Sequence, residues 1–162
     1  MSTKTRIGTG YDVHPLKAGR RLVLGGVELP FDRGLDGWSD ADVLTHAVID
    51  ALLGAAALGD IGSHFPPGDA QYKGIPSLEL LENVREKLAA TNYRVVNIDA
   101  TVVAEKPRLR EYIDDMRGNL SKALDIDTGR VSVKASTANR VGSIGRGEGI
   151  ASHAVAMIEV KE

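Results

Sequence analysis

Apolar residues recur at helical spacing in three stretches of the chain. The first begins after Ser39, which we expect as its N-cap with Asp42 at the third helical position, and runs until Gly59. The second covers residues 77–90. The third opens at Pro107, a residue favoured in the first turn of a helix. Each stretch predicts a helix, and the first is so apolar that it should lie at the centre of the fold.

Strand signals lie on both sides of these helices. Three segments are rich in β-branched and small apolar residues and predict strands: 93–105, 131–137 and 150–160. We also expect a short strand over 6–11. Residues 21–30 are typical of a hairpin around two glycines. The element order lacks the strict alternation of a doubly wound fold. We therefore expect an α+β (mixed α/β) fold with one mixed β-sheet, helices on one face, and another subunit covering the other face.

Length, composition and charge narrow the class of protein. The 162 residues, 43% hydrophobic and 26% charged, fit one domain over 1–162. With 20 Lys and Arg against 22 Asp and Glu, the net charge is −2, without the basic excess of a nucleic-acid binder. No apolar run reaches the roughly 18 residues of a membrane span, and the first five residues lack a signal-peptide core, so we expect a cytoplasmic protein with no membrane partner.

The chain has no cysteine, so a metal site must use carboxylates and the 4 histidines. Asp12 and His14 are two apart and point the same way in an extended chain. His46 lies four residues from both Asp42 and Asp50 on the central helix, where a polar stripe needs partners. Asp12, His14 and His46 supply the ligand count of an open zinc site, with Asp50 as an acceptor for an imidazole N–H. A solvent-exposed helix face is the alternative.

The remaining candidates lie in glycine-rich segments. Residues 62–76 predict a long functional loop. Four glycines between 142 and 149 follow Ser136-Thr137, and their backbone N–H groups together with Arg146 suit a phosphate or carboxylate. The segment has no Walker pattern, and a mobile loop is its alternative interpretation. His64 and His153 have no comparable setting, so we expect them to be structural or at the surface.

Several motifs then occur together in one order along the chain. They are RIGTGYDVH at 6–14, SDADVLTH at 39–46, DALLGAAALGDIG at 50–62, FP at 65–66 and GRGEGI at 145–150. With them the chain resembles the 2-C-methyl-D-erythritol 2,4-cyclodiphosphate synthase family over nearly its whole length. The resemblance implies a homotrimer whose sheets pack around a threefold axis, with active sites between subunits. It also implies a metal-dependent, CMP-releasing lyase of isoprenoid biosynthesis.

The substrate that the resemblance implies is 4-diphosphocytidyl-2-C-methyl-D-erythritol 2-phosphate, whose 2-phosphate attacks the β-phosphorus. By resemblance, Asp12, His14 and His46 hold one Zn²⁺ per subunit, while Mg²⁺ or Mn²⁺ bridges the substrate diphosphate. Thr137, Trp38 and Ser39 are the expected catalytic residues. The expected substrate contacts are Asp12, His14, Trp38 and Ser39; Asp60, Ile61 and Gly62 at the ribose; Phe65 and Asp69 in a flap; Ala104, Lys106, Pro107, Arg108, Leu109 and Arg110 at the cytidine; and Ser136, Thr137, Ala138, Asn139 and Arg146 at phosphates.

Five positions depart from the family's pattern. Trp38 stands where histidine is typical, so an indole or backbone N–H would have to replace the imidazole. Asn139 replaces an acid that helps to hold magnesium, Pro67-Gly68 replaces an acid of the flap, and Ser143 replaces an aromatic residue at the central cavity. Two rival functions follow: a trimeric cytidine-nucleotide-binding regulatory module without catalysis, and a metal-dependent phosphohydrolase.

Overall fold

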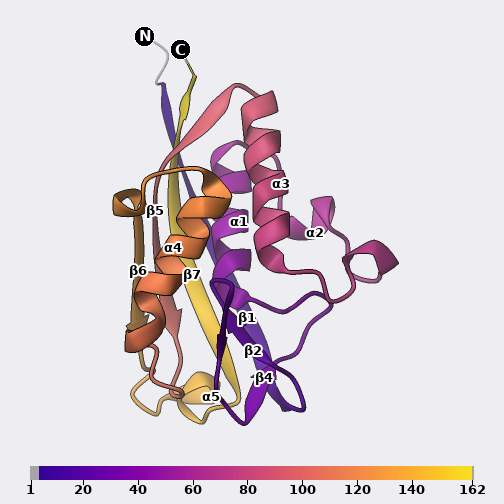
Figure 1. The fold of residues 1–162 in the computed structure, drawn as a ribbon, viewed down its shortest axis with the longest axis vertical. Coiled ribbons are helices and arrows are strands. Elements are labelled where there is room, and N and C mark those ends of the chain that lie inside the picture. Colours follow the sequence, from indigo (N-terminus) through magenta and orange to yellow (C-terminus); the bar gives the residue numbers. More distant parts are fainter. Residues whose placement is uncertain (1–3, 162) are drawn as a thin grey trace.

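Five strands form one mixed sheet in the computed structural model, which describes residues 4–161 (Figure 1). The ends of the predicted 1–162 domain, and with them the first residues of the N-terminal segment, lie outside the described residues. The strands are β1 (Thr5–Ala18), β4 (Arg33–Leu35), β5 (Tyr93–Val103), β6 (Val131–Ser136) and β7 (Gly149–Val160). They lie in the order β4-β1-β7-β5-β6, and only β5 and β6 are parallel.

A small hairpin and the helices complete the fold. The hairpin of β2 (Leu22–Leu24) and β3 (Val27–Leu29) is confirmed as a separate two-stranded sheet. The helices are α1 (Val43–Ala55), α2 (Ile61–His64), α3 (Ser77–Ala90), α4 (Ile113–Leu124) and α5 (Gly142–Gly145), with 3₁₀ turns η1 (Ala70–Tyr72), η2 (Arg110–Tyr112) and η3 (Thr128–Arg130). In Figure 1 the long helices α1, α3 and α4 lie along the same side of the sheet, which confirms the predicted fold class.

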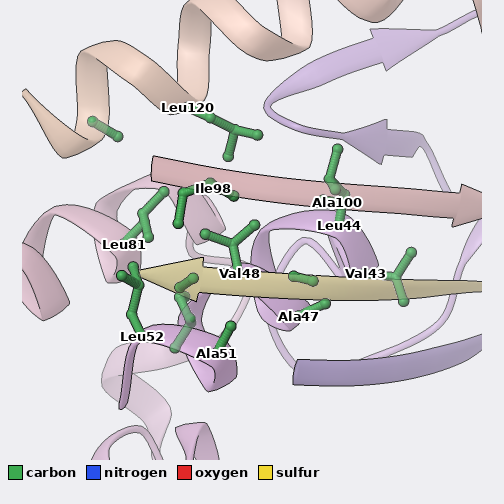
Figure 2. Close-up of a cluster of buried hydrophobic side chains, with 14 of the residues drawn as sticks. Val43, Leu44, Ala47, Val48, Ala51, Leu52, Leu81, Ile98, Ala100 and Leu120 are labelled. Carbon is green, nitrogen blue, oxygen red and sulfur yellow. The ribbon is translucent and has the colours of Figure 1, made fainter. Parts of the chain in front are cut away.

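The core lies between this sheet face and the three long helices. Figure 2 shows side chains of α1 gathered with those of β5, α3 and α4. Val48, Leu52, Leu81 and Leu120 are fully buried, and Ile98 is almost so. Burial of one such side chain contributes about 1.5–3 kcal/mol, so α1 is the element around which the fold closes.

Two glycines of β1 bring that strand unusually close to α1. A Cβ atom at Gly8 would collide with the carbonyl oxygen of Ala51, and one at Gly10 with that of Ala47. Because strand residues two apart share a face, the next positions facing α1 are 12 and 14. The glycines therefore set the short distance at which Asp12 and His14 approach the helix.

The opposite face of the sheet carries apolar side chains without cover from the described chain. Ile7 is 64% exposed, Tyr11 54%, Val13 46% and Val155 45%. These residues alternate with the buried positions of β1 and β7. No helix within residues 4–161 is long and apolar enough to cross a membrane.

The start of α1 differs from the expectation. Ser39 is not its N-cap: Ala41 adopts a left-handed φ of 57°, which no helix accommodates, and the helix begins at Val43. Asp42 is the N-cap, because its carboxylate accepts hydrogen bonds from Thr45 N and from Gly25 N in the hairpin turn. The contact with the hairpin, which no local pattern encodes, decides the cap.

Other expectations also differ from the structure, beginning with the end of the first helix, which lies at Ala55 and not at Gly59. The first strand extends to Ala18 and not to residue 11, because β7 pairs with it over almost its full length. The loop 62–76 is not structureless but contains η1 and most of α2. Pro107 does not open the third helix, which starts at Ile113. The preceding Glu105 instead binds the backbone N–H groups of residues 138 and 140.

Candidate metal centre and substrate cavity

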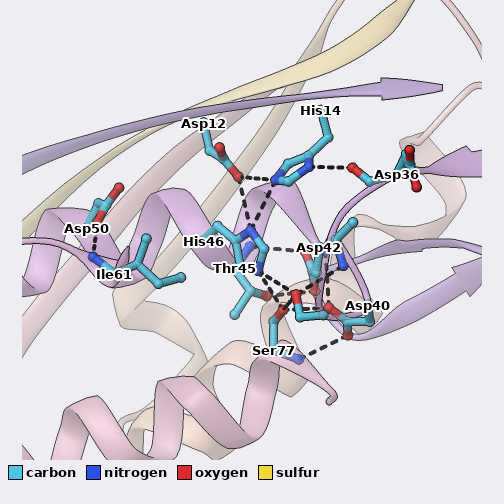
Figure 3. A network of polar contacts seen from close by, with 12 residues as sticks. Asp12, His14, Asp36, Asp40, Asp42, Thr45, His46, Asp50, Ile61 and Ser77 are labelled. Atoms are coloured by element: carbon cyan, nitrogen blue, oxygen red, sulfur yellow. Dashed lines mark hydrogen bonds and ion pairs between the residues drawn. The ribbon is translucent and has the colours of Figure 1, made fainter. Parts of the chain in front are cut away.

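Three side chains from β1 and α1 converge on one point (Figure 3). Asp12 Oδ2 lies 2.9 Å from His14 Nε2 and 3.0 Å from His46 Nδ1, and the two nitrogens are 3.4 Å apart. Tetrahedral zinc with bonds of about 2.0–2.2 Å places its ligand atoms about 3.3–3.6 Å apart. One carboxylate and two imidazoles at this spacing fit such an ion with small side-chain movements and leave a fourth position open.

The other nitrogen of each imidazole fixes which ring atom faces the cluster. His14 Nδ1 lies 2.7 Å from the carbonyl oxygen of Asp36, which can only accept, so Nδ1 carries the proton. His46 Nε2 lies 2.8 Å from Ser77 Oγ, which itself donates to Asp40 Oδ1 at 2.5 Å. His46 therefore donates from Nε2. In the neutral rings, both lone pairs point at Asp12, as metal ligation requires.

The electrostatics of the cluster favour an ionised carboxylate. Burial opposes the charge of Asp12, but hydrogen bonds and charge attraction from His14 and His46, in the protonated form that the rings take without a metal, outweigh it and lower the pKa of Asp12 to about 2. Burial likewise opposes protonation of His14, yet its bonds to Asp12 and to the Asp36 carbonyl raise its pKa. The cluster thus presents a permanent anion to a cation.

Two acids that the helical spacing grouped with His46 lie outside the cluster. Asp42 is fully buried as the cap of α1, and its burial raises its pKa. Asp50 is not an acceptor for an imidazole: its Oδ1 accepts from Ile61 N at 2.8 Å and holds the start of α2. His64 and His153 also lie elsewhere, the first bonded to Leu58 O and the second beside the Tyr11 ring.

The cluster forms one wall of a cavity of about 340 Å³. Ser39 Oγ reaches it 3.2 Å from His46 Nε2. The opposite wall comes from α2 and the segment after it, where Asp60 caps α2 and Asp69 caps η1. The residues that line the cavity are Asp12, His14, Trp38, Ser39, His46, Ile61, Gly62, Phe65, Pro67, Tyr72 and Leu80.

The other predicted contacts are not brought to this cavity. Lys106, Pro107, Arg108, Thr137 and Arg146 line a second cavity, of about 960 Å³, beyond the end of β6. Around it, the side chains of Ala104 and Leu109 are buried, whereas those of Arg110, Ser136 and Asn139 are exposed and that of Ala138 is partly buried. Within one chain the predicted residues therefore form two separate groups.

Several residues in or beside the two cavities were not expected from the sequence. Arg33 and Arg140 add positive charge to the second cavity, and Glu105 shapes the loop beside it through its two backbone contacts. Ser77 and Asp40 support His46. The serine at the start of a helix carried no signal of its own, since such serines are common caps.

Fold and site together define a class of α+β protein. Its members have a cluster of one carboxylate and two imidazoles where a strand packs on the central helix, and a second cavity lined by cationic side chains. The chain belongs to the YgbB family, whose model matches residues 5–159.

Individual relatives point the same way. A 2-C-methyl-D-erythritol 2,4-cyclodiphosphate synthase of Dehalococcoides mccartyi (strain CBDB1) is 60% identical over 156 residues, which cover 96% of this chain and 99% of that protein. A Plasmodium falciparum IspF solved in complex with CDP is similar with a TM-score of 0.86 at 31% identity, with full coverage of both chains. The bifunctional IspDF of Campylobacter jejuni matches with a TM-score of 0.95 at 38% identity over 99% of this chain, which spans 44% of that longer chain.

Proposed function

We propose that the protein converts 4-diphosphocytidyl-2-C-methyl-D-erythritol 2-phosphate to the cyclic 2,4-diphosphate and CMP. The observation that carries the proposal is the convergence of Asp12, His14 and His46 at a cavity, in a chain whose curated relatives are named for this synthase activity. The reaction is a lyase reaction of isoprenoid biosynthesis. Its substrate is a water-soluble metabolite, so we place the protein in the cytoplasm, with no nucleic-acid or membrane partner.

The reaction requires that the two phosphate groups be positioned close together and that their negative charge be compensated. The nucleophile is already an anionic phosphate, so no strong general base is needed, but two phosphates that repel each other must meet. Zn²⁺ on the cluster and Mg²⁺ or Mn²⁺ on the diphosphate would supply the offsetting positive charge. Asp12, His14 and His46 fit the zinc by donor type and spacing. Asn139 would hold magnesium more weakly than an acid, because its amide oxygen is neutral.

The remaining predicted residues would orient and stabilise the substrate. Ser39 offers a hydroxyl beside the metal cluster for the diphosphate. Thr137 lies in the second cavity among Lys106, Arg108 and Arg146, where its hydroxyl can meet a phosphate that those cations attract. A substrate held at fixed geometry closes its ring faster than water can attack, which favours the cyclic product.

We also propose a homotrimer in which each active site combines groups from two subunits. The two groups of predicted residues line different cavities of a single chain, so one substrate can touch both only if neighbouring chains contribute. The exposed apolar sheet face of Ile7, Tyr11, Val13 and Val155 supports burial of that face against other copies.

The test is release of CMP by purified protein supplied with zinc, magnesium and the diphosphocytidyl substrate. We expect turnover by the natural sequence and by the control variant His64→Ala, whose histidine lies outside the cluster. His46→Ala should lose at least about a hundredfold in turnover while staying folded, since second-sphere changes alone cost 10–100-fold. Absence of CMP with every divalent metal would reject the proposal.

A cytidine-nucleotide-binding module without catalysis is the second candidate. Two observations favour it: Asn139 lacks the charge of an acid, and the indole N–H of Trp38 is already bonded to Asp69 O. Tight CDP binding with unaltered substrate would support this candidate. A phosphohydrolase would instead produce a linear product.

A further inference from the structure

Trp38, the only tryptophan of the chain, spans the two walls of the cavity. It lies between β4 and α1 directly before Ser39, and its side chain is 39% exposed. Its indole Nε1–H donates to the carbonyl oxygen of Asp69 at 2.8 Å, across to the segment on the other side of the cavity. The N–H that was expected to meet the diphosphate is thus used within the protein.

The base of that segment is also tied to the backbone around Trp38. Gly74 N donates to Trp38 O at 2.9 Å, and Asp40 N donates to Ile75 O at 3.1 Å. The ammonium group of Lys73 lies 5.9 Å from the centre of the indole ring, within the range of a weak cation–π contact. These contacts hold residues 73–75 firmly beside residues 38–40.

Residues 66–72, which we call the cavity segment, have far fewer contacts with the rest of the chain. Within them, Asp69 N donates to Pro66 O and Tyr72 N to Asp69 O, so the bonds are local. In the chain from 4 to 161, the indole bond is the one hydrogen bond that joins the cavity segment to a residue outside 66–75. The Tyr72 ring adds an edge contact to Phe65.

One glycine with a positive φ lies in the cavity segment and another lies just after it. Gly68 has a φ of 93° and Gly74 a φ of 68°, conformations that other residues rarely adopt, and a Cβ added at either position would meet no atom within 4 Å. A segment whose other hydrogen bonds are all local opens at low cost unless a specific contact holds it.

We propose that Trp38 is a positioning residue whose indole N–H holds the cavity segment over the metal cluster and thereby limits how often this wall opens. Pro67 and Tyr72 of the segment line the cavity opposite His14 and His46. Loss of the bond therefore removes cover from the site without touching the cluster. The effect of Trp38 on substrate binding rests on the proposed function, whereas its hydrogen bond to the cavity segment does not.

Amide hydrogen exchange of Trp38→Phe tests the hold directly. Phenylalanine keeps a ring and removes the donor. One neutral hydrogen bond corresponds to about a fivefold change in an opening equilibrium, so exchange of the hydrogen-bonded amides of Asp69, Gln71 and Tyr72 should rise about fivefold. Exchange in α1 should stay at the level of the natural sequence. Lys73→Ala, which keeps the indole bond, should leave exchange of the segment unchanged.

Steady-state kinetics on the same variants separate positioning from a general structural defect. We expect Trp38→Phe to raise KM for the diphosphocytidyl substrate about fivefold and to affect kcat less. Unchanged exchange of residues 66–72 would overturn the proposal, as would equal increases throughout α1 and the segment. If the natural sequence shows no turnover, the proposed function fails, and the exchange experiment still decides the role of Trp38.

Discussion

Ser77 Oγ lies 2.8 Å from His46 Nε2, on the nitrogen of the ring that does not face Asp12 (Figure 3). The Ser77 hydroxyl donates its own hydrogen bond to Asp40 Oδ1, and Asp40 Oδ2 accepts from Ser77 N at 3.0 Å. The first residue of α3 therefore orients a side chain of α1. The metal-type cluster depends on the packing of these two helices and not only on its three members.

Ser77→Ala should weaken zinc binding about 10–100-fold, because His46 loses the acceptor that fixes its tautomer and ring angle. Competition with a chromophoric chelator measures the affinity. Ser121→Ala, which removes another buried serine in α4, is the matched control and should bind zinc as tightly as the natural sequence. Equal affinities in all three proteins would contradict a role of Ser77 in metal binding.

Asp12 should make stability depend on acid pH in protein stripped of metal by a chelator. The folded state keeps Asp12 ionised down to about pH 2, whereas the unfolded chain protonates near 3.8. The stabilisation is therefore complete above about pH 4 and is lost as pH falls towards 2, with a size of roughly 1–2 kcal/mol after screening. Denaturant unfolding of the natural sequence and Asp12→Asn should show their difference shrinking over this range. A constant difference would refute the coupling.

Gly10→Ala should destabilise the fold by about 1–3 kcal/mol or more, because the added Cβ collides with the Ala47 carbonyl and pushes β1 from α1. Gly54→Ala is the matched control. Its Cβ would lie 3.8 Å from Thr9 O, and alanine is the better helix former, so this change should be neutral or stabilising by up to about 1 kcal/mol. Thermal unfolding measures both, and similar effects of the two changes would disprove the close approach.

Ile7→Glu and Val155→Glu should convert the proposed trimer to a monomer, because each places a charge on the exposed apolar sheet face. Sedimentation velocity reports the mass. Lys122→Glu, on the exposed side of α4, should keep the trimer mass. A natural sequence that sediments as a monomer would contradict the assembly.

The sequence predicted most of the elements for a clear physical reason. The helix over 77–90 matches α3 at both ends, and the strands over 131–137 and 150–160 match β6 and β7 within a residue, because their apolar periodicity coincides with burial. The start of α1 could not be predicted, since the hairpin turn, far away in sequence, selects Asp42 over Ser39.

The candidate site, too, was predictable where it depends on local geometry and not where it depends on distant contacts. Asp12 and His14 share a face of one strand, so their pairing follows from local geometry, but their meeting with His46 needed the glycine-dependent packing of β1 on α1. Asp50 lies four residues from His46, as an acceptor for its ring would, but its carboxylate accepts a hydrogen bond from the backbone at the start of α2 instead. The distant contacts of Trp38 with residue 69 have no local signal at all.

Under the proposed function, the protein closes a ring between two phosphate groups of its substrate. Phosphorus NMR of the products, formed from the diphosphocytidyl substrate with zinc and magnesium, tests it most directly. We expect one equivalent of CMP for each cyclic 2,4-diphosphate, and we expect His46→Ala to abolish both products. A linear phosphate product, or bound but unaltered substrate, would contradict it.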